Sequence, residues 1–321
     1  MRRPETKNRG ARVTRADING MRCLFIENSL IRLRINLDLG ADIVEFVYKP
    51  SDVDAMWRSP LPEIPFSRAA GPVKTEQGFL YYYEGGWQEL FPHASRAEDA
   101  YGAALPMHGE AWSLSWEYRI QKDTPEEVVV AMWCSTRMLP FMLLRRLRIQ
   151  EGEAFVTLEE RVENTGTEHV SFIWGHHPAF GEPFLEEGCL LSASGDTLYD
   201  GKNETPWPPP EDGIVFTRIP PKSSGKGAMV YILDLKEGLY EITNPRRQLT
   251  FRMTWDKEVF PYIWVWQEFG SNKGYPWFGR AYAMAVEPVS SLPFARSEGG
   301  RMLSLAGGAS IETALTAGFV A

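Results

Sequence analysis

Hydrophobic and polar residues alternate along several segments of the chain, with the period of two that is expected for half-buried β-strands. The alternation is clearest in residues 31–35, 114–120 and 155–162. Later segments with the same pattern lie at residues 230–233, 249–255, 262–267, 281–286 and 310–315. Residues 128–133 are apolar at consecutive positions, which is typical of a strand that is covered on both faces.

Few segments place apolar residues at the spacing of a helix, and 28 glycines and 23 prolines interrupt the chain too often for long helices. Many short strands separated by turns predict an all-β fold, in which two antiparallel sheets pack as a large sandwich. Two long connections, residues 51–80 and 200–225, interrupt this rhythm. Connections of that length usually line a site or cap the end of a sheet.

The strand pattern resumes unchanged after the Pro208-Pro209-Pro210 run, so we predict a single domain over residues 16–321 rather than two domains joined at that run. Residues 1–15 are polar and are predicted to form a disordered basic tail, with a basic interaction arm as the alternative. No apolar segment follows the first positive charges, as a secretory signal requires. No stretch approaches the roughly 20 apolar residues that span a bilayer.

The formal net charge of −8 and the pI near 5.3 disfavour nucleic acid and anionic membrane surfaces as partners. Cys23, Cys134 and Cys189 are odd in number, widely spaced and set in or beside apolar stretches. This pattern favours buried free thiols in a reducing compartment, and we predict a cytoplasmic protein.

The candidates for chemistry are four histidines and one carboxylate: His93, His108, His176, His177 and Glu287. Adjacent residues of a strand point to opposite faces, so His176 and His177 are not expected to share a metal ion. The sequence also lacks the Gly-x-Ser-x-Gly turn of a serine hydrolase and a glycine-rich phosphate loop. These absences leave acid–base chemistry as the option to consider.

An imidazole and a carboxylate can give and take protons across a pocket near neutral pH. Glu287 ends an otherwise apolar strand, where burial is costly unless the carboxylate is paired or reaches a polar pocket. The alternative is that Glu287 ends its strand in solvent and that the histidines are hydrogen-bonded structural groups.

Three segments occur in the order found in the aldose 1-epimerase (galactose mutarotase-like) family, which this sequence resembles: Pro106-Met107-His108-Gly109, Gly175-His176-His177-Pro178-Ala179-Phe180 and Val286-Glu287-Pro288. The segment from Gly85-Gly86 to Phe91-Pro92 is also similar to one in that family, and the resemblance covers residues 22–316. It implies a β-supersandwich fold and an isomerase that interconverts the α and β anomers of a free aldose.

The resemblance also implies roles for these residues. Glu287 matches the base that removes the proton of the anomeric hydroxyl, and His177 matches the acid that protonates the ring oxygen. His108 resembles a second histidine that hydrogen-bonds near the ring oxygen, while His176 is expected to point away. No cofactor is implied, the partner is a small-molecule sugar, and we expect a monomer or a homodimer.

Sugar recognition requires flat apolar side chains and hydrogen-bonding groups. Candidates for the first are Trp87, Trp264, Trp266 and Phe180, and candidates for the second are Gln88, Glu110 and Gln267. Trp264 and Trp266 share one strand face, and a face that carries two tryptophans is more often part of a core.

The sequence departs from the galactose-type pattern because His176 stands where those members have asparagine. Its short His-Pro-Ala-Phe segment is similar to the branch that includes hexose-6-phosphate and sulfosugar mutarotases. Such substrates need a cationic contact, for which Arg68, Arg96 and Arg280 are candidates.

Two other functions stay open at this point. One is a noncatalytic carbohydrate-binding protein, and the other is an epimerase or isomerase of another sugar on the same scaffold, because fold does not fix function. A glycoside hydrolase would need a second catalytic carboxylate, for which Glu110 is the candidate.

Overall fold

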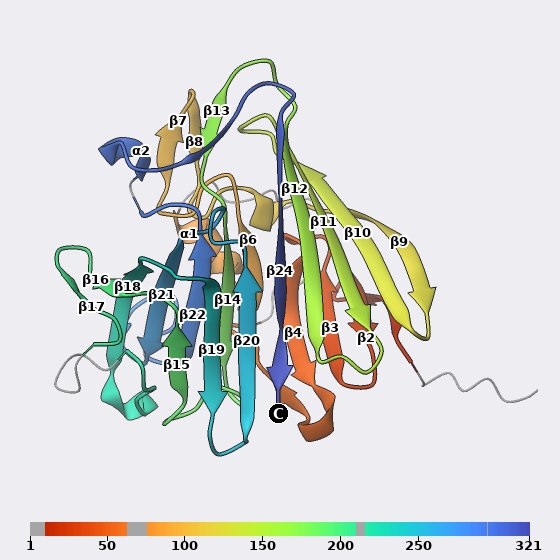
Figure 1. Ribbon diagram of the computed structural model, residues 1–321, viewed down its shortest axis with the longest axis vertical. Coiled ribbons are helices and arrows are strands. Elements are labelled where there is room, and N and C mark those ends of the chain that lie inside the picture. Colours follow the sequence, from red (N-terminus) through yellow and green to blue (C-terminus); the bar gives the residue numbers. More distant parts are fainter. Residues whose placement is uncertain (1–9, 63–75, 210–215, 294) are drawn as a thin grey trace, which may run out of the picture.

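Two antiparallel sheets lie face to face in the computed structural model (Figure 1), which describes residues 10–62, 76–209, 216–293 and 295–321. Within these residues, the larger sheet has twelve strands in the order β1 (Arg12–Ile18), β2 (Met21–Glu27), β3 (Ile31–Asn36), β4 (Asp42–Tyr48), β6 (Trp87–Leu90), β14 (Gly175–Gly181), β22 (Tyr282–Val289), β21 (Tyr262–Phe269), β18 (Lys226–Leu233), β16 (Thr197–Tyr199) and β17 (Glu204–Pro206), with β5 (Val53–Asp54) beside β4. The smaller sheet has eight strands in the order β15 (Leu190–Ala193), β19 (Gly238–Asn244), β20 (Leu249–Trp255), β24 (Ser310–Val320), β12 (Phe155–Asn164), β11 (Phe141–Gln150), β10 (Glu127–Ser135) and β9 (Glu117–Thr124). Strands make up 53% of the structure and helices 6%, which confirms the predicted all-β fold.

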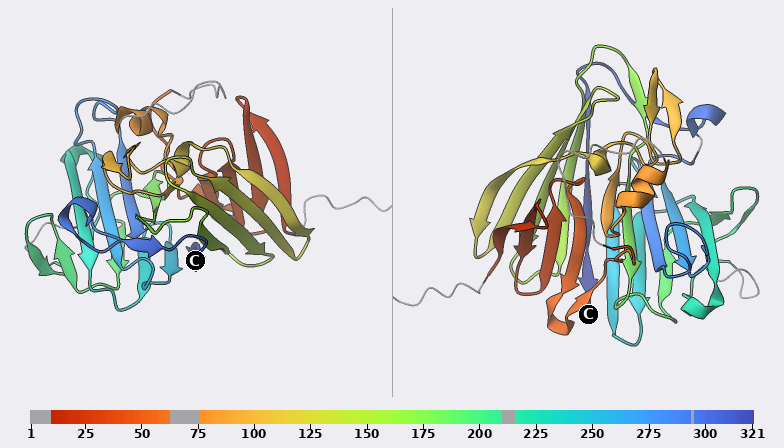
Figure 2. Two further views of the ribbon diagram at one scale, coloured as in Figure 1. Left: turned by 90° about the horizontal axis from the view of Figure 1, so that it is seen from above. Right: turned by 180° about the vertical axis from the view of Figure 1, so that it is seen from behind.

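Shorter elements lie outside the two large sheets. Two strand pairs are β7 (Glu98–Ala100) with β8 (Ala103–Leu105), and β13 (Val170–Phe172) with β23 (Leu303–Leu305). The helices are α1 (Glu76–Tyr82) and α2 (Ala295–Glu298), and single 3-10 turns cover Lys49–Ser51, Ala111–Ser113 and Lys222–Ser224. The right-hand view of Figure 2 shows α1 against the outer face of the larger sheet, where its Phe79 packs in one cluster with residues of β14 and β22.

Side-chain alternation decides which residues enter the core. In β3, Ile31, Leu33 and Ile35 are fully buried, whereas Arg32 and Arg34 point to the opposite face. The main cluster of buried apolar side chains draws on both large sheets, so one core holds them together. Each of the other predicted strand segments overlaps a strand, but several strands extend two to five residues beyond the predicted ends, as β18 and β24 do.

Two sequence predictions about strand boundaries were wrong. β1 begins at Arg12, so residues 12–15 are part of the larger sheet and not of a disordered tail, while residues 1–9 lie outside the described residues. A polar strand is stable there because β1 is an edge strand, whose exposed positions tolerate charge. The predicted strand at residues 114–120 begins only at Glu117, because Trp116 donates its backbone N–H to Leu37 of the segment that follows β3.

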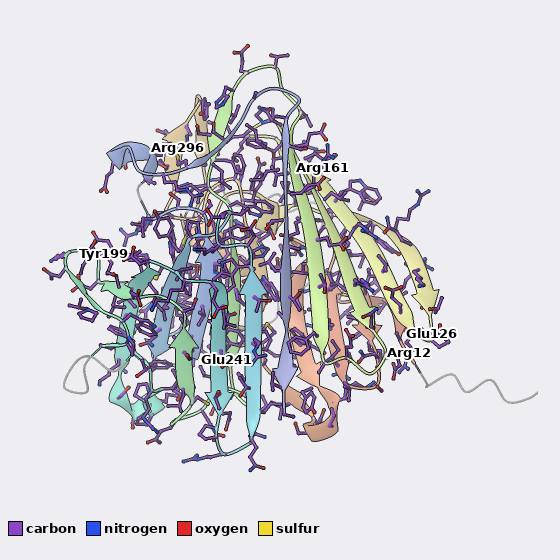
Figure 3. All side chains as sticks on the ribbon, in the orientation of Figure 1. Arg12, Glu126, Arg161, Tyr199, Glu241 and Arg296 are labelled. Atoms are coloured by element: carbon purple, nitrogen blue, oxygen red, sulfur yellow. The ribbon has the colours of Figure 1, made fainter. Side chains whose placement is uncertain are left out.

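Charged side chains cover the outer face of the smaller sheet (Figure 3). Arg161 there pairs with Glu312 of the neighbouring strand, and Arg252 pairs with Glu241. The three cysteines are buried and free, as their apolar surroundings predict. None of the helices in the described part of the chain has the length and apolar character needed to cross a bilayer.

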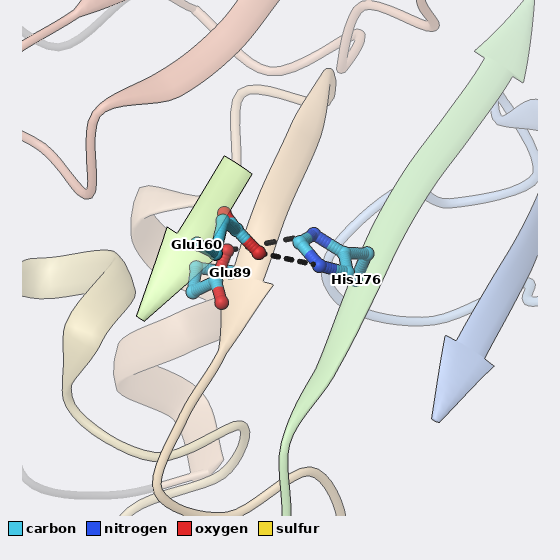
Figure 4. Close-up of side chains that lie close together, drawn as sticks. All are labelled: Glu89, Glu160 and His176. Atoms are coloured by element: carbon cyan, nitrogen blue, oxygen red, sulfur yellow. Dashed lines mark ion pairs between the residues drawn. The ribbon is translucent and has the colours of Figure 1, made fainter. Parts of the chain in front are cut away.

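Four ionisable side chains meet in the interior between the two sheets, and Figure 4 shows three of them. Arg145 and Glu160 are cross-strand neighbours in the smaller sheet, and Glu89 and His176 are cross-strand neighbours in the larger one. Arg145 Nε donates to Glu160 Oε1 at 2.7 Å, and the same guanidinium also contacts Glu89. His176 Nε2 lies 3.0 Å from Glu160 Oε2. We refer to Glu89, Arg145, Glu160 and His176 as the inter-sheet ion cluster.

The inter-sheet ion cluster is stable only as a set, because each charge in it has lost its contact with water. Although burial works against it, the charges of His176 and Arg145 lower the pKa of Glu160 to about 2. Arg145 contacts both carboxylates, one from each sheet, as His176 also does. Its removal leaves two buried carboxylates without the guanidinium that they share.

We therefore expect Arg145→Met to lower the free energy of unfolding by about 3–5 kcal/mol, the usual loss when one partner of a buried ion pair is removed. Urea unfolding at pH 7 measures this loss. Arg146→Met is the matched control, because Arg146 is the next residue of β11 and pairs with Glu159 on the exposed face. The free energy of unfolding of this control variant should fall by no more than about 1 kcal/mol. Equal losses in the two variants would show that the cluster does not stabilise the fold.

Candidate active site

A row of neighbouring side chains crosses the outer face of the larger sheet. The strand registers pair Tyr231 of β18 with Trp264 of β21, and Trp264 with Glu287 of β22. The register of β14 against β22 then places His177 opposite Glu287. Side chains that face each other on adjacent antiparallel strands lie about 5 Å apart at Cβ, so four strands bring these residues together.

This row lines a pocket of about 510 Å³. Aromatic side chains form much of its wall: Phe79, Tyr83, Tyr231, Trp264, Trp266 and Trp277. Its polar groups include Ser95, Arg96, His108, His177 and Glu287. The three residues predicted to carry acid–base chemistry, His108, His177 and Glu287, therefore share one hollow.

The carboxyl group of Glu287 and the imidazole of His177 lie at the centre of the chemistry that the pocket can perform. Glu287 is 1% exposed, and its Oε1 lies 3.6 Å from His177 Nε2. Among the described residues, Glu287 Oε2 has no hydrogen-bond partner. A buried carboxyl oxygen without a partner is costly for folding, which marks it as a group retained for another purpose.

Burial shifts both groups toward their neutral forms. It raises the pKa of Glu287 well above its usual value and lowers the pKa of His177 to about 4. Both shifts favour the form of the pair in which the carboxyl group carries one proton and the imidazole is neutral. An acid and a base that share one proton can exchange protons with a bound molecule without net gain or loss.

A tight turn directs His108 into the same pocket. His108 and Gly109 both adopt positive φ angles, 62° and 74°, and a Cβ at Gly109 would lie 2.3 Å from the carbonyl oxygen of Phe91. His108 Nδ1 lies 2.6 Å from the carbonyl oxygen of Ala94. Because a carbonyl oxygen only accepts, Nδ1 carries the hydrogen and Nε2 is the free acceptor. The rings of His108 and His177 are 5.4 Å apart.

A family model described as a domain of unknown function, DUF4432, matches residues 18–318. The chain belongs to the DUF4432 family. Among curated proteins, no sequence matches this DUF4432 chain significantly.

Solved structures identify the fold of the DUF4432 chain. A Klebsiella pneumoniae protein proposed to be an aldose 1-epimerase is 17% identical, with a TM-score of 0.74 over 94% of this chain and 79% of that one. A galactose mutarotase-like protein from Clostridium acetobutylicum is 14% identical, with a TM-score of 0.69 over 97% and 99% of the two chains. A galactose mutarotase related enzyme from Lactobacillus acidophilus is 18% identical, with a TM-score of 0.65 over 93% and 97%. These likenesses confirm the galactose mutarotase-like fold that the sequence resemblance implied.

The inter-sheet ion cluster contains donor atoms of the kind that bind metal ions. Atoms of Glu89, Glu160 and His176 lie within 4.8 Å of one another. Arg145, however, already contacts both carboxylates, and its fixed positive charge would repel a cation placed between them. The residues present therefore fit an ion-pair network better than a metal site. His176 points away from His177, as strand alternation predicts.

Three of the predicted sugar contacts point to the inner face of the larger sheet, away from the pocket: Trp87, Phe180 and Gln267. The indole Nε1 of Trp87 lies 3.2 Å from His176 Nδ1, inside the sandwich. Phe180 is fully buried among core aromatic rings, and Gln267 donates to a backbone carbonyl oxygen. Each of them belongs to the set of alternate residues on its strand that enters the core, so none lines the pocket.

Gln88 and Glu110 do not line the pocket either, and the amide nitrogen of Gln88 and the carboxylate of Glu110 are hydrogen-bonded elsewhere. The Gln88 amide donates to Asp42 at 3.0 Å and to the carbonyl oxygen of Gly85 at 2.5 Å. Glu110 accepts the backbone N–H groups of Arg137 and Met138 at 2.8–3.0 Å. Neither residue lines the pocket, and Glu110 is not placed to serve as the second carboxylate of a hydrolase.

Trp264 and Trp266 line the pocket, and Trp264 also belongs to a cluster of buried apolar side chains, as expected for a face that carries two tryptophans. Sequence reasoning missed Phe79, Tyr83 and Trp277, which come from α1 and from connections. The prediction that the connection at residues 51–80 lines a site was the one signal for Phe79. Of the three candidate arginines, Arg96 lines the pocket, whereas the guanidinium of Arg280 donates to backbone carbonyl oxygens. Arg68 lies outside the described residues.

The buried imidazole of His108 makes stability depend on pH. Burial lowers its pKa from the usual 6.5 to about 3, so protons bind the unfolded chain more readily than the folded one. The stabilisation is present above pH 6.5 and is lost as the pH falls toward 3. Because of this one group, the free energy of unfolding should be about 2 kcal/mol lower at pH 5 than at pH 7.

His108→Asn should remove that part of the pH dependence, because asparagine does not titrate and tolerates a positive φ. Urea unfolding at the two pH values measures the difference. His169→Asn is the control, since it makes the same replacement at an exposed position outside the pocket. An undiminished pH dependence in His108→Asn would contradict the assignment.

Proposed function

We propose that this DUF4432 chain is an aldose 1-epimerase, which interconverts the α and β anomers of a free aldose by acid–base ring opening. The observation that carries the proposal is the buried carboxyl group of Glu287, unpartnered at Oε2 among the described residues and 3.6 Å from His177 Nε2. The names of the structural neighbours support the same activity.

The pocket has the size and surface that a sugar requires. Ligand pockets usually have volumes of about 300–1,000 Å³, and this one has about 510 Å³. Trp264, Trp266 and Trp277 offer flat apolar faces for the C–H faces of a pyranose ring. His108 lies beside His177, which faces Glu287, and the reacting end of the sugar would lie at these three groups.

In the proposed reaction, hydroxyl groups of the bound sugar solvate Glu287 and favour its carboxylate form, so the shared proton moves to His177. The carboxylate then takes the proton of the anomeric hydroxyl, while His177 Nε2 gives its proton to the ring oxygen. The bond between C1 and the ring oxygen breaks and an aldehyde forms. Rotation about the bond between C1 and C2 followed by the reverse steps yields the other anomer and restores both protons.

His108 contributes as a hydrogen-bond acceptor in this scheme. Its Nδ1–H donates to the carbonyl oxygen of Ala94. Its Nε2 can therefore accept a hydrogen bond from the hydroxyl group that forms when the ring opens. This holds the open-chain form in place until it closes again. The two protons that move in the scheme come from the anomeric hydroxyl of the sugar and from His177 Nε2.

Glu287→Gln and His177→Asn should each slow anomer exchange at least about 100-fold, the lower end of what general acid–base assistance contributes. Polarimetry and exchange NMR on freshly dissolved aldoses measure the rate above the spontaneous one. His169→Asn serves as the imidazole control and should retain full activity. Exchange that persists unchanged in both pocket variants would refute the mechanism.

A noncatalytic sugar-binding protein is the competing function. Titration of the same sugars separates the two, because Glu287→Gln should still bind sugar with little change in affinity. Sugar binding by the unmodified protein without any acceleration of exchange would favour the binding protein.

Arg96 supports a second candidate within the same reaction class, an aldose that carries an anionic group. The side chain lines the pocket, is exposed, and forms no ion pair with any acidic side chain among the described residues. A cation that lines the pocket can bind a phosphate or sulfonate substituent of the sugar.

Arg96→Met should raise the KM for an aldose 6-phosphate about tenfold or more, because a hydrogen bond to a charged group is lost. The KM for the corresponding neutral aldose should change little, and this substrate pair is the internal control. Equal changes for both substrates would mean that Arg96 does not recognise an anionic group.

A further inference from the structure

The phenol of Tyr83 lies behind the imidazole of His177. Its hydroxyl oxygen is 3.3 Å from His177 Nδ1, on the opposite side of the ring from the nitrogen that faces Glu287. The phenol ring is held in place by Phe79, which stacks on it with centroids 4.8 Å apart, and by Trp57 at 5.4 Å. Tyr83 is only 4% exposed, so its hydroxyl occupies a fixed position beside Nδ1.

The position of Glu287 decides which nitrogen of His177 must keep its hydrogen. One proton between Nε2 and the carboxyl group gives either a carboxylic acid facing an imidazole or a carboxylate facing an imidazolium. In both arrangements Nδ1 carries a hydrogen, because an imidazole that accepts at Nε2 is protonated at Nδ1 and an imidazolium is protonated at both nitrogens. The opposite neutral tautomer would present Nε2–H to the carboxyl group and could not take up a proton there.

We propose that Tyr83 is a positioning residue for this pair: its hydroxyl oxygen accepts Nδ1–H of His177 and so confines proton exchange to Nε2. The proposal rests on the proposed function, since it concerns the acid of that reaction. His108 follows the same plan with a different acceptor, because its Nδ1–H is held by the carbonyl of Ala94. Both histidines thus present Nε2 to the pocket.

This arrangement gives Tyr83 two different hydrogen bonds. Its oxygen accepts from His177 throughout the cycle, while Nε2 gives its proton to the ring oxygen and later recovers it. Its own O–H is then directed into the pocket that the residue lines, where it can donate to a sugar hydroxyl. The carbonyl behind His108 can only accept, whereas the phenol behind His177 both anchors the ring and offers a donor to the substrate.

The test combines NMR of the imidazole nitrogens with kinetics. In protein labelled with 15N-histidine, long-range 1H–15N spectra report which nitrogen carries the hydrogen, and His177→Asn identifies the signals of His177. We expect Nδ1–H in the unmodified protein and a shift toward the Nε2–H tautomer in Tyr83→Phe, which keeps the ring contacts. The kcat for anomer exchange should fall about tenfold in this variant, while KM changes less than about threefold. Tyr81→Phe, on the exposed side of α1, should change neither quantity.

The possible outcomes separate this inference from the proposed function. A His177 that is protonated only at Nε2 in the unmodified protein overturns the inference, even if anomer exchange is fast and depends on Glu287. A fall in kcat in Tyr83→Phe with an unchanged tautomer also overturns it, because Tyr83 would then act on the sugar alone. If no sugar is exchanged, the proposed function is wrong, and the spectra still decide whether Tyr83 holds Nδ1–H.

Discussion

The whole site depends on the rule that successive side chains of a strand point to opposite faces. In β14 this rule sends His176 into the sandwich and His177 into the pocket, although the two residues are neighbours in sequence. A shift of one residue in the register would exchange them, placing an acid–base group in the core and an ion-cluster residue in the pocket. The inter-sheet ion cluster opposes such a shift, because it accepts an imidazole at that one position.

Much of the fold could be predicted from the sequence, because alternation is a local property. The apolar positions of β3 and β12 follow it directly, and both strands were predicted. Arg145 and Glu160 occupy inward positions of β11 and β12, where an apolar side chain is expected. This interruption of the pattern is a signal for the inter-sheet ion cluster, but their partners come from β6 and β14, which only the packing of the two sheets brings near.

The sequence predicted the acid–base residues of the candidate site but not most of the side chains around them, and this difference has a physical cause. His108, His177 and Glu287 lie in short segments that resemble a family, and they meet in one pocket. The sugar contacts were inferred from residue type and sequence proximity, neither of which says which face a side chain occupies. Trp87 and Gln267 have suitable chemistry but face the core. Tyr83 belongs to the wall because α1 packs across the sheet, a long-range contact that no local pattern encodes.

Glu287 and His177, the proposed acid–base pair, stand on neighbouring strands, whereas much of the pocket wall comes from α1 and the connections. The distance between neighbouring strands is nearly the same in all β-sheets, so changes in the pocket wall should not alter the separation of Glu287 and His177. Replacements around Phe79, Arg96 or Trp277 can therefore alter which molecule is admitted while the proton-transfer geometry persists. A scaffold divided in this way can diversify its substrates without rebuilding its chemistry.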